Sequence, residues 1–160
     1  MIRIGIGNDV HRLVEGRPLF IGGISIESEL GADGHSDADV LCHALCDAIL
    51  GALGVGDLGT HFPNDEERWR NAESFIFLRY VVGLMKERGY QVGNVDSTVH
   101  LERPKLRPYI DQIRTGLSDV LETDSQNISV KAKTGEAVDA VGERRAVRAD
   151  VVVLLTRSSD

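Results

Sequence analysis

The chain has 160 residues, of which 42% are hydrophobic and 27% charged, and its formal net charge is −7. This length allows one domain with a sizeable core and is short for two, so we expect a single domain over residues 1–160. The acidic balance argues against a nucleic-acid partner. The longest apolar run, residues 151–155, is far shorter than a membrane span, and no signal peptide is recognisable. A cytoplasmic protein is therefore expected, or a plastid one if a transit peptide has been removed.

A strand and a hairpin are expected first in the chain. Residues 3–7 alternate between basic, apolar and glycine residues and predict a strand that ends at Asp9 and His11. Residues 19–26 predict a short hairpin that turns at two consecutive glycines. The Gly-X-Gly of residues 5–7 lacks the third glycine and the following helix of a dinucleotide-binding motif, so it does not predict dinucleotide binding.

The first long helix is expected over residues 37–53. Ser36 is a plausible N-cap, and Gly54 would end the helix. Cys42 and Cys46 are one helical turn apart. We interpret them as small apolar side chains on the buried face of this helix and predict no disulfide.

The middle of the chain predicts a loop, a helix and a strand. Residues 57–70 combine glycine, proline and charged residues and predict a mobile loop. Residues 72–88 predict a second helix that Gly89 closes. Residues 91–101 alternate well enough to predict a strand.

The last third of the chain predicts a third helix over residues 108–121 and strands over residues 128–132 and 146–156. The apolar residues expected on one face of this helix are Ile110, Ile113, Leu117, Val120 and Leu121. Strands and helices mix without a strict repeat, and at least one face of the sheet needs a cover of helices. We therefore predict an α/β (α+β) sandwich in which three helices cover one mixed β-sheet.

Two short segments carry side chains that suit a metal ion. Asp9 and His11 are two residues apart, so on an extended backbone both leave the same face. His43 lies one turn into the expected helix. Two imidazoles and a carboxylate form a good zinc set, and three protein ligands leave the fourth tetrahedral position open. Asp39 and Asp47, four residues to either side of His43, are expected to orient its ring.

Six segments, taken in order, resemble the 2-C-methyl-D-erythritol 2,4-cyclodiphosphate synthases, enzymes of the non-mevalonate route to isoprenoids. The segments are residues 7–13 (GNDVHRL), 34–40 (GHSDADV), 57–63 (DLGTHFP), 93–98 (GNVDST), 103–108 (RPKLRP) and 130–136 (VKAKTGE). The likeness runs from residue 3 to about residue 155. Six motifs in the same order are hard to obtain by chance.

The resemblance implies a metal-dependent lyase. Its substrate would be 4-diphosphocytidyl-2-C-methyl-D-erythritol 2-phosphate, and its products 2-C-methyl-D-erythritol 2,4-cyclodiphosphate and CMP. The substrate's own 2-phosphate attacks its β-phosphate, which agrees with the lack of a convincing Ser-His-Asp or Cys-His set in the sequence. A ferredoxin-like arrangement in a homotrimer, with active sites at the subunit interfaces, is also implied.

The resemblance also assigns roles to particular residues. The zinc ligands would be Asp9, His11 and His43. Glu136 would bind a second divalent ion, magnesium or manganese, while His35 and Thr134 would position the phosphates and stabilise the transition state. The residues expected to surround the cytidine diphosphate substrate are Asp9, His11, His35, Ser36, Asp57, Gly59, Phe62, Asp65, Glu66, Leu101, Pro104, Lys105, Leu106, Arg107, Ala132, Lys133, Thr134 and Glu136.

Two segments depart from the family pattern. Many relatives have Phe-Pro-Asp-Thr-Asp where this chain has Asn64 at the first acidic position, so Asp65 or Glu66 would have to supply the carboxylate. Many relatives have Gly-Phe-x-Gly-Arg where residues 139–143 read DAVGE. The arginine helps some relatives to bind an isoprenoid diphosphate in a central cavity, and that secondary site is in doubt here.

Two other functions fit the same ligands. A zinc-dependent phosphodiesterase or nucleotide hydrolase would need a residue that activates water, and Asp47 and Asp57 are the candidates. A non-catalytic trimeric scaffold with a structural zinc is the second alternative. The open ligand position and the cluster of Lys133, Thr134 and Glu136 argue against the scaffold.

Overall fold

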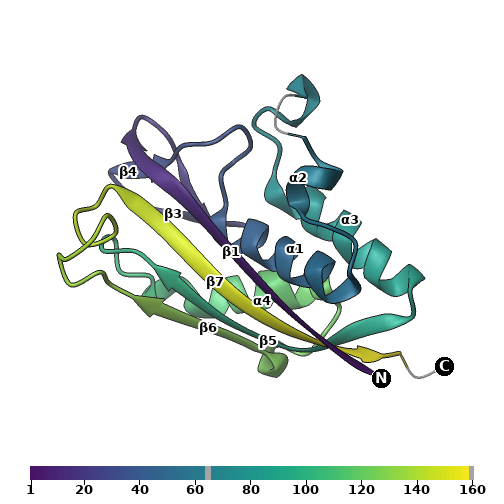
Figure 1. The fold of residues 1–160 in the computed structure, drawn as a ribbon. Coiled ribbons are helices and arrows are strands. Elements are labelled where there is room, and N and C mark those ends of the chain that lie inside the picture. Colours follow the sequence, from purple (N-terminus) through teal and green to yellow (C-terminus); the bar gives the residue numbers. More distant parts are fainter. Residues whose placement is uncertain (64–65, 159–160) are drawn as a thin grey trace.

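The computed structural model describes residues 1–63 and 66–158 and shows a twisted β-sheet with helices packed on one of its faces (Figure 1). The sheet has five strands in the order β4-β1-β7-β5-β6. Their bounds are Ile2–Glu15 for β1, Leu30–Ala32 for β4, Tyr90–His100 for β5, Ile128–Lys133 for β6 and Ala146–Arg157 for β7. β5 and β6 are parallel and the other neighbours are antiparallel, so the expected mixed sheet is confirmed.

A separate hairpin and three long helices complete the fold. The hairpin pairs β2 (Leu19–Ile21) with β3 (Ile24–Ile26), as expected. The long helices are α1 (Val40–Leu53), α3 (Ser74–Glu87) and α4 (Ile110–Leu121). Shorter helical turns cover Leu58–His61 (α2), Glu67–Trp69, Arg107–Tyr109 and Ser125–Asn127. The three expected helices are therefore confirmed, with first residues two or three positions later than the sequence predicted.

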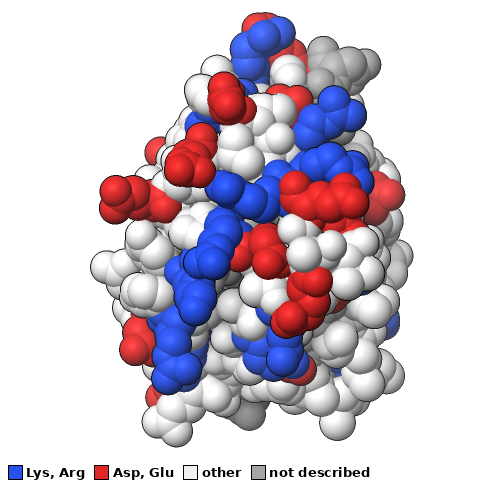
Figure 2. All heavy atoms as spheres, turned by 90° about the vertical axis from the view of Figure 1, so that its left-hand side faces the viewer, with Lys and Arg blue, Asp and Glu red and all other residues white. Residues whose placement is uncertain are grey.

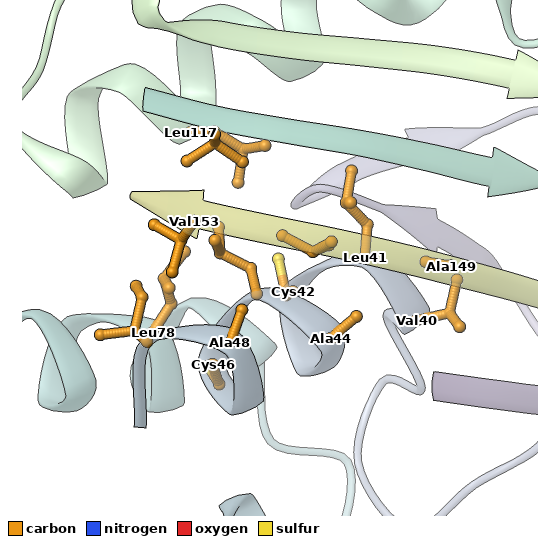
Figure 3. Packing of buried hydrophobic residues seen from close by; sticks show 14 of the residues in the cluster. Val40, Leu41, Cys42, Ala44, Cys46, Ala48, Leu78, Leu117, Ala149 and Val153 are labelled. Carbon is orange, nitrogen blue, oxygen red and sulfur yellow. The ribbon is translucent and has the colours of Figure 1, made fainter. Parts of the chain in front are cut away.

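The helices and one face of the sheet enclose the apolar core (Figure 3). Val153 of β7, Leu78 of α3 and Leu117 of α4 are all fully buried in it. Cys42 and Cys46 of α1 are also fully buried and are free thiols, which confirms their interpretation as small apolar side chains. Among the residues that the structure describes, no helix combines the length and the apolar character that crossing a membrane demands.

Strand β1 is longer than the sequence predicted. It does not end before Asp9 and His11 but continues through them to Glu15. It pairs with β7 as far as Arg12 and then with the short strand β4, where the sequence predicted only a loop. Because pairing with β7 keeps β1 extended through Asp9 and His11, their side chains leave the same face of the sheet.

Helix α1 lies very close to β1 because the strand has glycines where the helix crosses it. A Cβ built on Gly5 would lie 1.8 Å from the carbonyl oxygen of Ala48, and Gly7 meets Ala44 in the same way. A larger residue at either position would push the helix off the strand. The Gly-X-Gly of this strand therefore serves helix packing.

The start of α1 differs from the prediction. Asp39, not Ser36, is the N-cap, and its side chain accepts a hydrogen bond from the backbone N–H of Cys42. The same carboxylate accepts the backbone N–H groups of Gly22 and Gly23, which ties the β2–β3 turn to the helix. Gly54 ends the helix in the left-handed conformation, as expected.

The segment that the sequence predicted as a loop, residues 57–70, contains helical turns. Asp57 caps α2, accepting hydrogen bonds from the backbone N–H and the hydroxyl of Thr60 at 2.8 and 2.7 Å. A 3-10 turn follows at Glu67–Trp69. The segment predicted as a loop therefore contains two helical turns, and the Asp57 cap stabilises the first of them. Asn64 and Asp65 lie outside the described residues.

Candidate metal centre and active site

Asp9, His11 and His43 bring three ligand atoms together where β1 meets α1. Asp9 Oδ2 lies 2.9 Å from His11 Nε2 and 3.0 Å from His43 Nδ1, and the two nitrogens are 3.3 Å apart. Ligand atoms about 2.1 Å from a tetrahedral metal ion lie about 3.4 Å from one another. The three side chains therefore fit one divalent ion with small movements.

Two features of the fold bring these three side chains together: the alternation of side chains along β1 and the close packing of α1 on that strand. Asp9 and His11 occupy alternate positions of β1 that face α1, the face that also carries Gly7. His43 precedes Ala44, the residue that Gly7 contacts, so the close packing of helix on strand brings its ring over the pair. The three side chains are partly exposed, at 25%, 17% and 12% in the order Asp9, His11 and His43. An ion bound there has a side open to ligands.

Hydrogen bonds and charge interactions between the carboxylate and the imidazoles shift the pKa values of Asp9 and His11. Burial raises the pKa of Asp9, but hydrogen bonds and charges from His11 and His43 outweigh burial and hold that pKa well below its usual range. Burial lowers the pKa of His11, while the hydrogen bond and charge of Asp9 raise it, and the net shift is upward. Asp9 is therefore ionised at neutral pH, as a metal ligand must be, and protons compete with metal at His11.

The second nitrogen of each histidine has a partner outside the cluster. His11 Nδ1 lies 2.9 Å from the backbone carbonyl oxygen of Asp33. His43 Nε2 lies 2.9 Å from Ser74 Oγ and 3.2 Å from Ser36 Oγ. Partners of this kind orient metal-binding imidazoles in proteins.

The expected partners of His43 were wrong. The carboxylate of Asp39 accepts hydrogen bonds from backbone N–H groups at the start of α1 and in the β2–β3 turn. Asp47 accepts the backbone N–H of Leu58 at 2.7 Å and so holds the start of α2. Neither carboxylate hydrogen-bonds to the ring, because its Nδ1 faces Asp9 and His11 and its Nε2 faces Ser74 and Ser36.

A cavity of about 280 Å³ opens over the cluster. Its lining residues are Asp9, His11, Gly34, His35, Ser36, His43, Asp47, Leu58, Gly59, Phe62, Trp69 and Phe77. Phe62 packs against Phe77 and edge-on against Trp69, with ring centroids 4.6 and 5.0 Å apart. The cavity thus has a charged floor and an aromatic wall.

Several residues that the sequence predicted for substrate binding line this cavity. They include His35, Ser36, Gly59 and Phe62. The ring of His35 is fixed by the backbone carbonyl oxygen of Glu66, 3.0 Å from its Nε2. Asp57 is not among the lining residues, and its carboxylate caps α2.

The other predicted residues gather around a second cavity, of about 570 Å³, between β6, α4 and the segment after β5. Its lining includes Leu101, Lys105, Leu106, Arg107, Ala132, Lys133 and Thr134. Pro104 lines a neighbouring cavity together with Lys105. Glu136 lies beside this group, where it accepts a hydrogen bond of 3.0 Å from Thr134 Oγ1.

The predicted residues thus fall into two sets that lie apart within one chain. The first set surrounds the metal cluster, and the second surrounds the cavity beside Thr134. The cavity over the metal cluster and the cavity beside Thr134 share no lining residue. In the sheet, β7 and β5 lie between β1 and β6. Three strand spacings of about 4.8 Å separate β1 from β6 by about 14 Å.

Figure 2, which turns the left-hand side of Figure 1 toward the reader, shows a band of Lys and Arg flanked by Asp and Glu.

Sequence reasoning missed part of the site. Ser74 and Asp37 behind His43, and Trp69 and Phe77 in the cavity wall, were not predicted. Ser74 opens a helix that the sequence did predict, but the contact joins residues 31 positions apart. A single sequence carries no signal for such a contact.

Comparisons with known proteins agree with the geometry. The model of the YgbB family matches residues 2–156. A 2-C-methyl-D-erythritol 2,4-cyclodiphosphate synthase of Desulfitobacterium hafniense is 50% identical over 157 residues, which is 98% of this chain and 99% of the relative. A chloroplastic synthase of Oryza sativa subsp. japonica is 50% identical over 97% of this chain and 70% of its own length.

A solved structure shows the same fold. It is a 2C-methyl-D-erythritol-2,4-cyclodiphosphate synthase in its CDP-bound form, with a TM-score of 0.89 and 42% identity. The alignment covers 96% of this chain and all of that one. The likeness therefore extends over nearly the whole fold of this chain.

Proposed function

Because this chain belongs to the YgbB family of 2-C-methyl-D-erythritol 2,4-cyclodiphosphate synthases, we propose that Asp9, His11 and His43 form its catalytic metal centre. The chain has the family's lyase activity in the non-mevalonate pathway. It converts 4-diphosphocytidyl-2-C-methyl-D-erythritol 2-phosphate to 2-C-methyl-D-erythritol 2,4-cyclodiphosphate and CMP. The observation that supports the site is the convergence of three ligand atoms at 2.9–3.3 Å beneath an open cavity.

The donor set favours zinc at this centre. Two imidazole nitrogens and one carboxylate oxygen suit zinc with its fourth position open. Bound zinc supplies a Lewis acid for the β-phosphate. His35 and Ser36 beside the cluster would bind the phosphate oxygens.

The remaining walls of the first cavity suit the methylerythritol part of the substrate. Phe62 and the other aromatic rings would exclude water and pack against its carbon chain. Gly59, which has no side chain, leaves room at α2. Asp57 precedes this helix in the sequence and Glu66 follows it. Asp65, which the sequence also assigned here, lies outside the described residues.

The second cavity suits the cytidine diphosphate part. A solved relative binds CDP, and the residues from Leu101 to Arg107, with Ala132 and Lys133, provide backbone groups and positive charge around a space of about 570 Å³. Thr134 would donate its hydroxyl proton to a phosphate oxygen. Glu136 would then hold a magnesium or manganese ion, which binds through few carboxylates together with phosphate oxygens.

This separation supports a homotrimer with active sites between subunits. A single substrate molecule must contact both sets of residues, and within one chain the strands that carry them are about 14 Å apart. The sheet face opposite the helices also needs a cover: on β1, Ile2, Ile4, Ile6 and Val10 are 63%, 69%, 72% and 60% exposed. Apolar side chains in such a row are typical of a subunit interface. Cyclic symmetry would bring the first set of one subunit to the second set of its neighbour.

We extend the proposal to organisation and location. Residues 1–160 would form one catalytic domain with the ferredoxin-like arrangement that the resemblance implies. Relatives occur in bacteria and in a chloroplast, so the cytoplasm of a bacterium or a plastid is the proposed location.

Product analysis tests the function directly. The purified chain is incubated with the diphosphocytidyl substrate, zinc and magnesium, and the products are followed by phosphorus NMR. We expect the cyclic diphosphate and CMP. An open-chain hydrolysis product would instead favour a phosphodiesterase, and unchanged substrate would favour a non-catalytic protein.

A further inference from the structure

Ser74 connects His43 to a carboxylate that lies behind it. Ser74 is the first residue of α3 and is 1% exposed. Its Oγ lies 2.9 Å from His43 Nε2 and is in hydrogen-bonding contact with Asp37 Oδ1. Its backbone N–H donates to Asp37 Oδ2 at 2.8 Å. Three residues from three different segments therefore form one chain of hydrogen bonds that ends at the metal cluster.

The chemistry of the groups gives this chain a direction. A carboxylate only accepts hydrogen bonds, so both the N–H and the O–H of Ser74 donate to Asp37. The single hydroxyl proton of Ser74 is then engaged by Asp37. Toward His43, Ser74 Oγ can therefore only accept a hydrogen bond. The proton of that hydrogen bond belongs to His43 Nε2. In the neutral ring, which is the form that binds metal, Nδ1 faces Asp9 and His11 at 3.0 and 3.3 Å and is left to offer its lone pair to the ion.

We propose that Ser74, held by Asp37, is a positioning residue that fixes the ring and the tautomer of His43 for metal binding. The proposal rests on the metal centre proposed above and deepens it. The negative charge of Asp37 acts through the serine hydroxyl and makes the imidazole a stronger ligand. Second partners of this kind typically change metal affinity or activity by about 10–100-fold.

The surroundings of Asp37 and Ser74 are built to hold them. The backbone N–H of Asp37 donates to the carbonyl oxygen of Ala72 at 3.0 Å, which joins the segment before α1 to the segment before α3. Glu73, the N-cap of α3, makes no capping hydrogen bond with its side chain. The carboxylate of Asp37 takes that place at the positive end of the helix. The same contact therefore starts α3 and supports His43.

Ser36 is a weaker alternative for the same role. Its Oγ lies 3.2 Å from His43 Nε2 and also accepts the backbone N–H of Ala38 at 3.2 Å. Among the described residues no carboxylate hydrogen-bonds to its hydroxyl, so it has no negative charge to transmit to the ring. Its hydroxyl proton remains available for a ligand in the cavity that Ser36 lines.

The test measures cobalt affinity of the full chain by competition with a coloured chelator, and the visible absorption of the bound Co²⁺. We expect Ser74→Ala to weaken Co²⁺ binding about 10–100-fold and to change the absorption spectrum. The matched control is Ser118→Ala, which removes a buried hydroxyl that donates to the backbone of α4. It should lower thermal stability without changing the affinity or the spectrum.

Two further variants make the test decisive. Ser74→Thr keeps the hydroxyl and should restore affinity to within about threefold of the parent. Asp37→Asn keeps the shape, but its amide can donate to Ser74 Oγ, which lets the hydroxyl turn toward His43 Nε2. We therefore expect it to weaken Co²⁺ binding. Its remaining oxygen can still accept the backbone N–H of Ser74 at the start of α3, although the contact of Oδ1 with the backbone N–H of Asp39 is lost, so it provides a second test if Ser74→Ala does not fold.

The outcomes separate this proposal from the metal centre itself. A parent chain that binds no Co²⁺ would remove the centre. Normal binding by the parent, with unchanged affinity and spectrum in Ser74→Ala and Asp37→Asn, would overturn the role of Ser74 alone. A loss of thermal stability without a loss of affinity would likewise reduce Ser74 to a structural residue.

Discussion

Gly7 lies so close to Ala44 that a Cβ on the glycine would be 2.0 Å from the carbonyl oxygen of Ala44. The residue before Ala44 is His43, and the residue two positions after Gly7 is Asp9. The closeness of strand and helix at this one point therefore decides whether the carboxylate and the imidazole meet.

Gly7→Ala is expected to damage stability and metal binding together. The added methyl group would meet backbone atoms that cannot rotate away, at a cost of about 3 kcal/mol in the free energy of unfolding. Denaturant unfolding and metal content measure the two effects. Gly83→Ala in α3 is the control, because a Cβ there has no neighbour within 4 Å. It should stabilise the chain by about 0.5–1 kcal/mol, and equal effects of the two changes would contradict the packing argument.

His43→Ala should lose the metal and the activity while it keeps the fold. Two remaining ligands cannot hold zinc against water, so affinity should fall about 100-fold or more. His100→Ala is the matched control, since His100 pairs with Asp150 on β7. Metal analysis of both variants after gel filtration gives the answer, and full zinc occupancy of His43→Ala would refute the assignment.

Glu136→Gln should change only the requirement for the second cation. The amide keeps the size of the side chain but not its charge, so more magnesium or manganese should be needed for half-maximal activity. Zinc content should stay the same. Glu143→Gln, in the same segment, removes only a surface ion pair with Arg145 and serves as the control. An unaltered magnesium requirement in Glu136→Gln would mean that Glu136 is not a ligand.

Asp47→Asn should stabilise the metal-free chain at neutral pH. Burial raises the pKa of Asp47, with a smaller opposing effect from the N–H of Leu58. The native state therefore binds this proton more tightly than the unfolded state does, and stability falls as pH rises from about 4 through the raised native pKa. The neutral amide avoids that loss and can still accept from Leu58. The advantage of Asp47→Asn in urea unfolding should be full at pH 7 and should vanish as the pH approaches about 4.

Mixed subunits test the proposed trimer. His43→Ala and Thr134→Ala chains, each inactive alone, should recover part of the activity after subunit exchange, because some interfaces then receive both intact halves. Light scattering before and after mixing verifies the assembly. A fully active monomer, or no recovery after proven exchange, would rule out active sites shared between subunits.

Much of the fold was readable from local patterns. The helices over residues 40–53, 74–87 and 110–121 follow from the spacing of their apolar residues, and Gly54 and Gly89 mark the ends of the first two. The strands β5, β6 and β7 follow from alternation. These signals act between residues a few positions apart, so they survive in a single sequence.

The ligand set could also be proposed early. Asp9 and His11 had to share a face once their segment was extended, and His43, one turn into the expected helix, completed a zinc set that the resemblance also implies. Asp39 and Asp47 were wrong as its partners because helical spacing says which residues share a face and not which way a ring turns. The length of β1 was wrong because its end depends on β7 and β4, which lie far away in the sequence.

The three ligands of the metal cluster could therefore be read from the amino-acid order, and so could the family. Their distances, the tautomer that Ser74 imposes on His43 and the separation of the two cavities came from packing between distant segments. Hydrophobic periodicity and capping are local, whereas a contact such as Asp37 with Ser74 exists only after α3 has docked beside α1. That docking, together with the absence of a side chain at Gly7, turns a plausible set of ligands into a site.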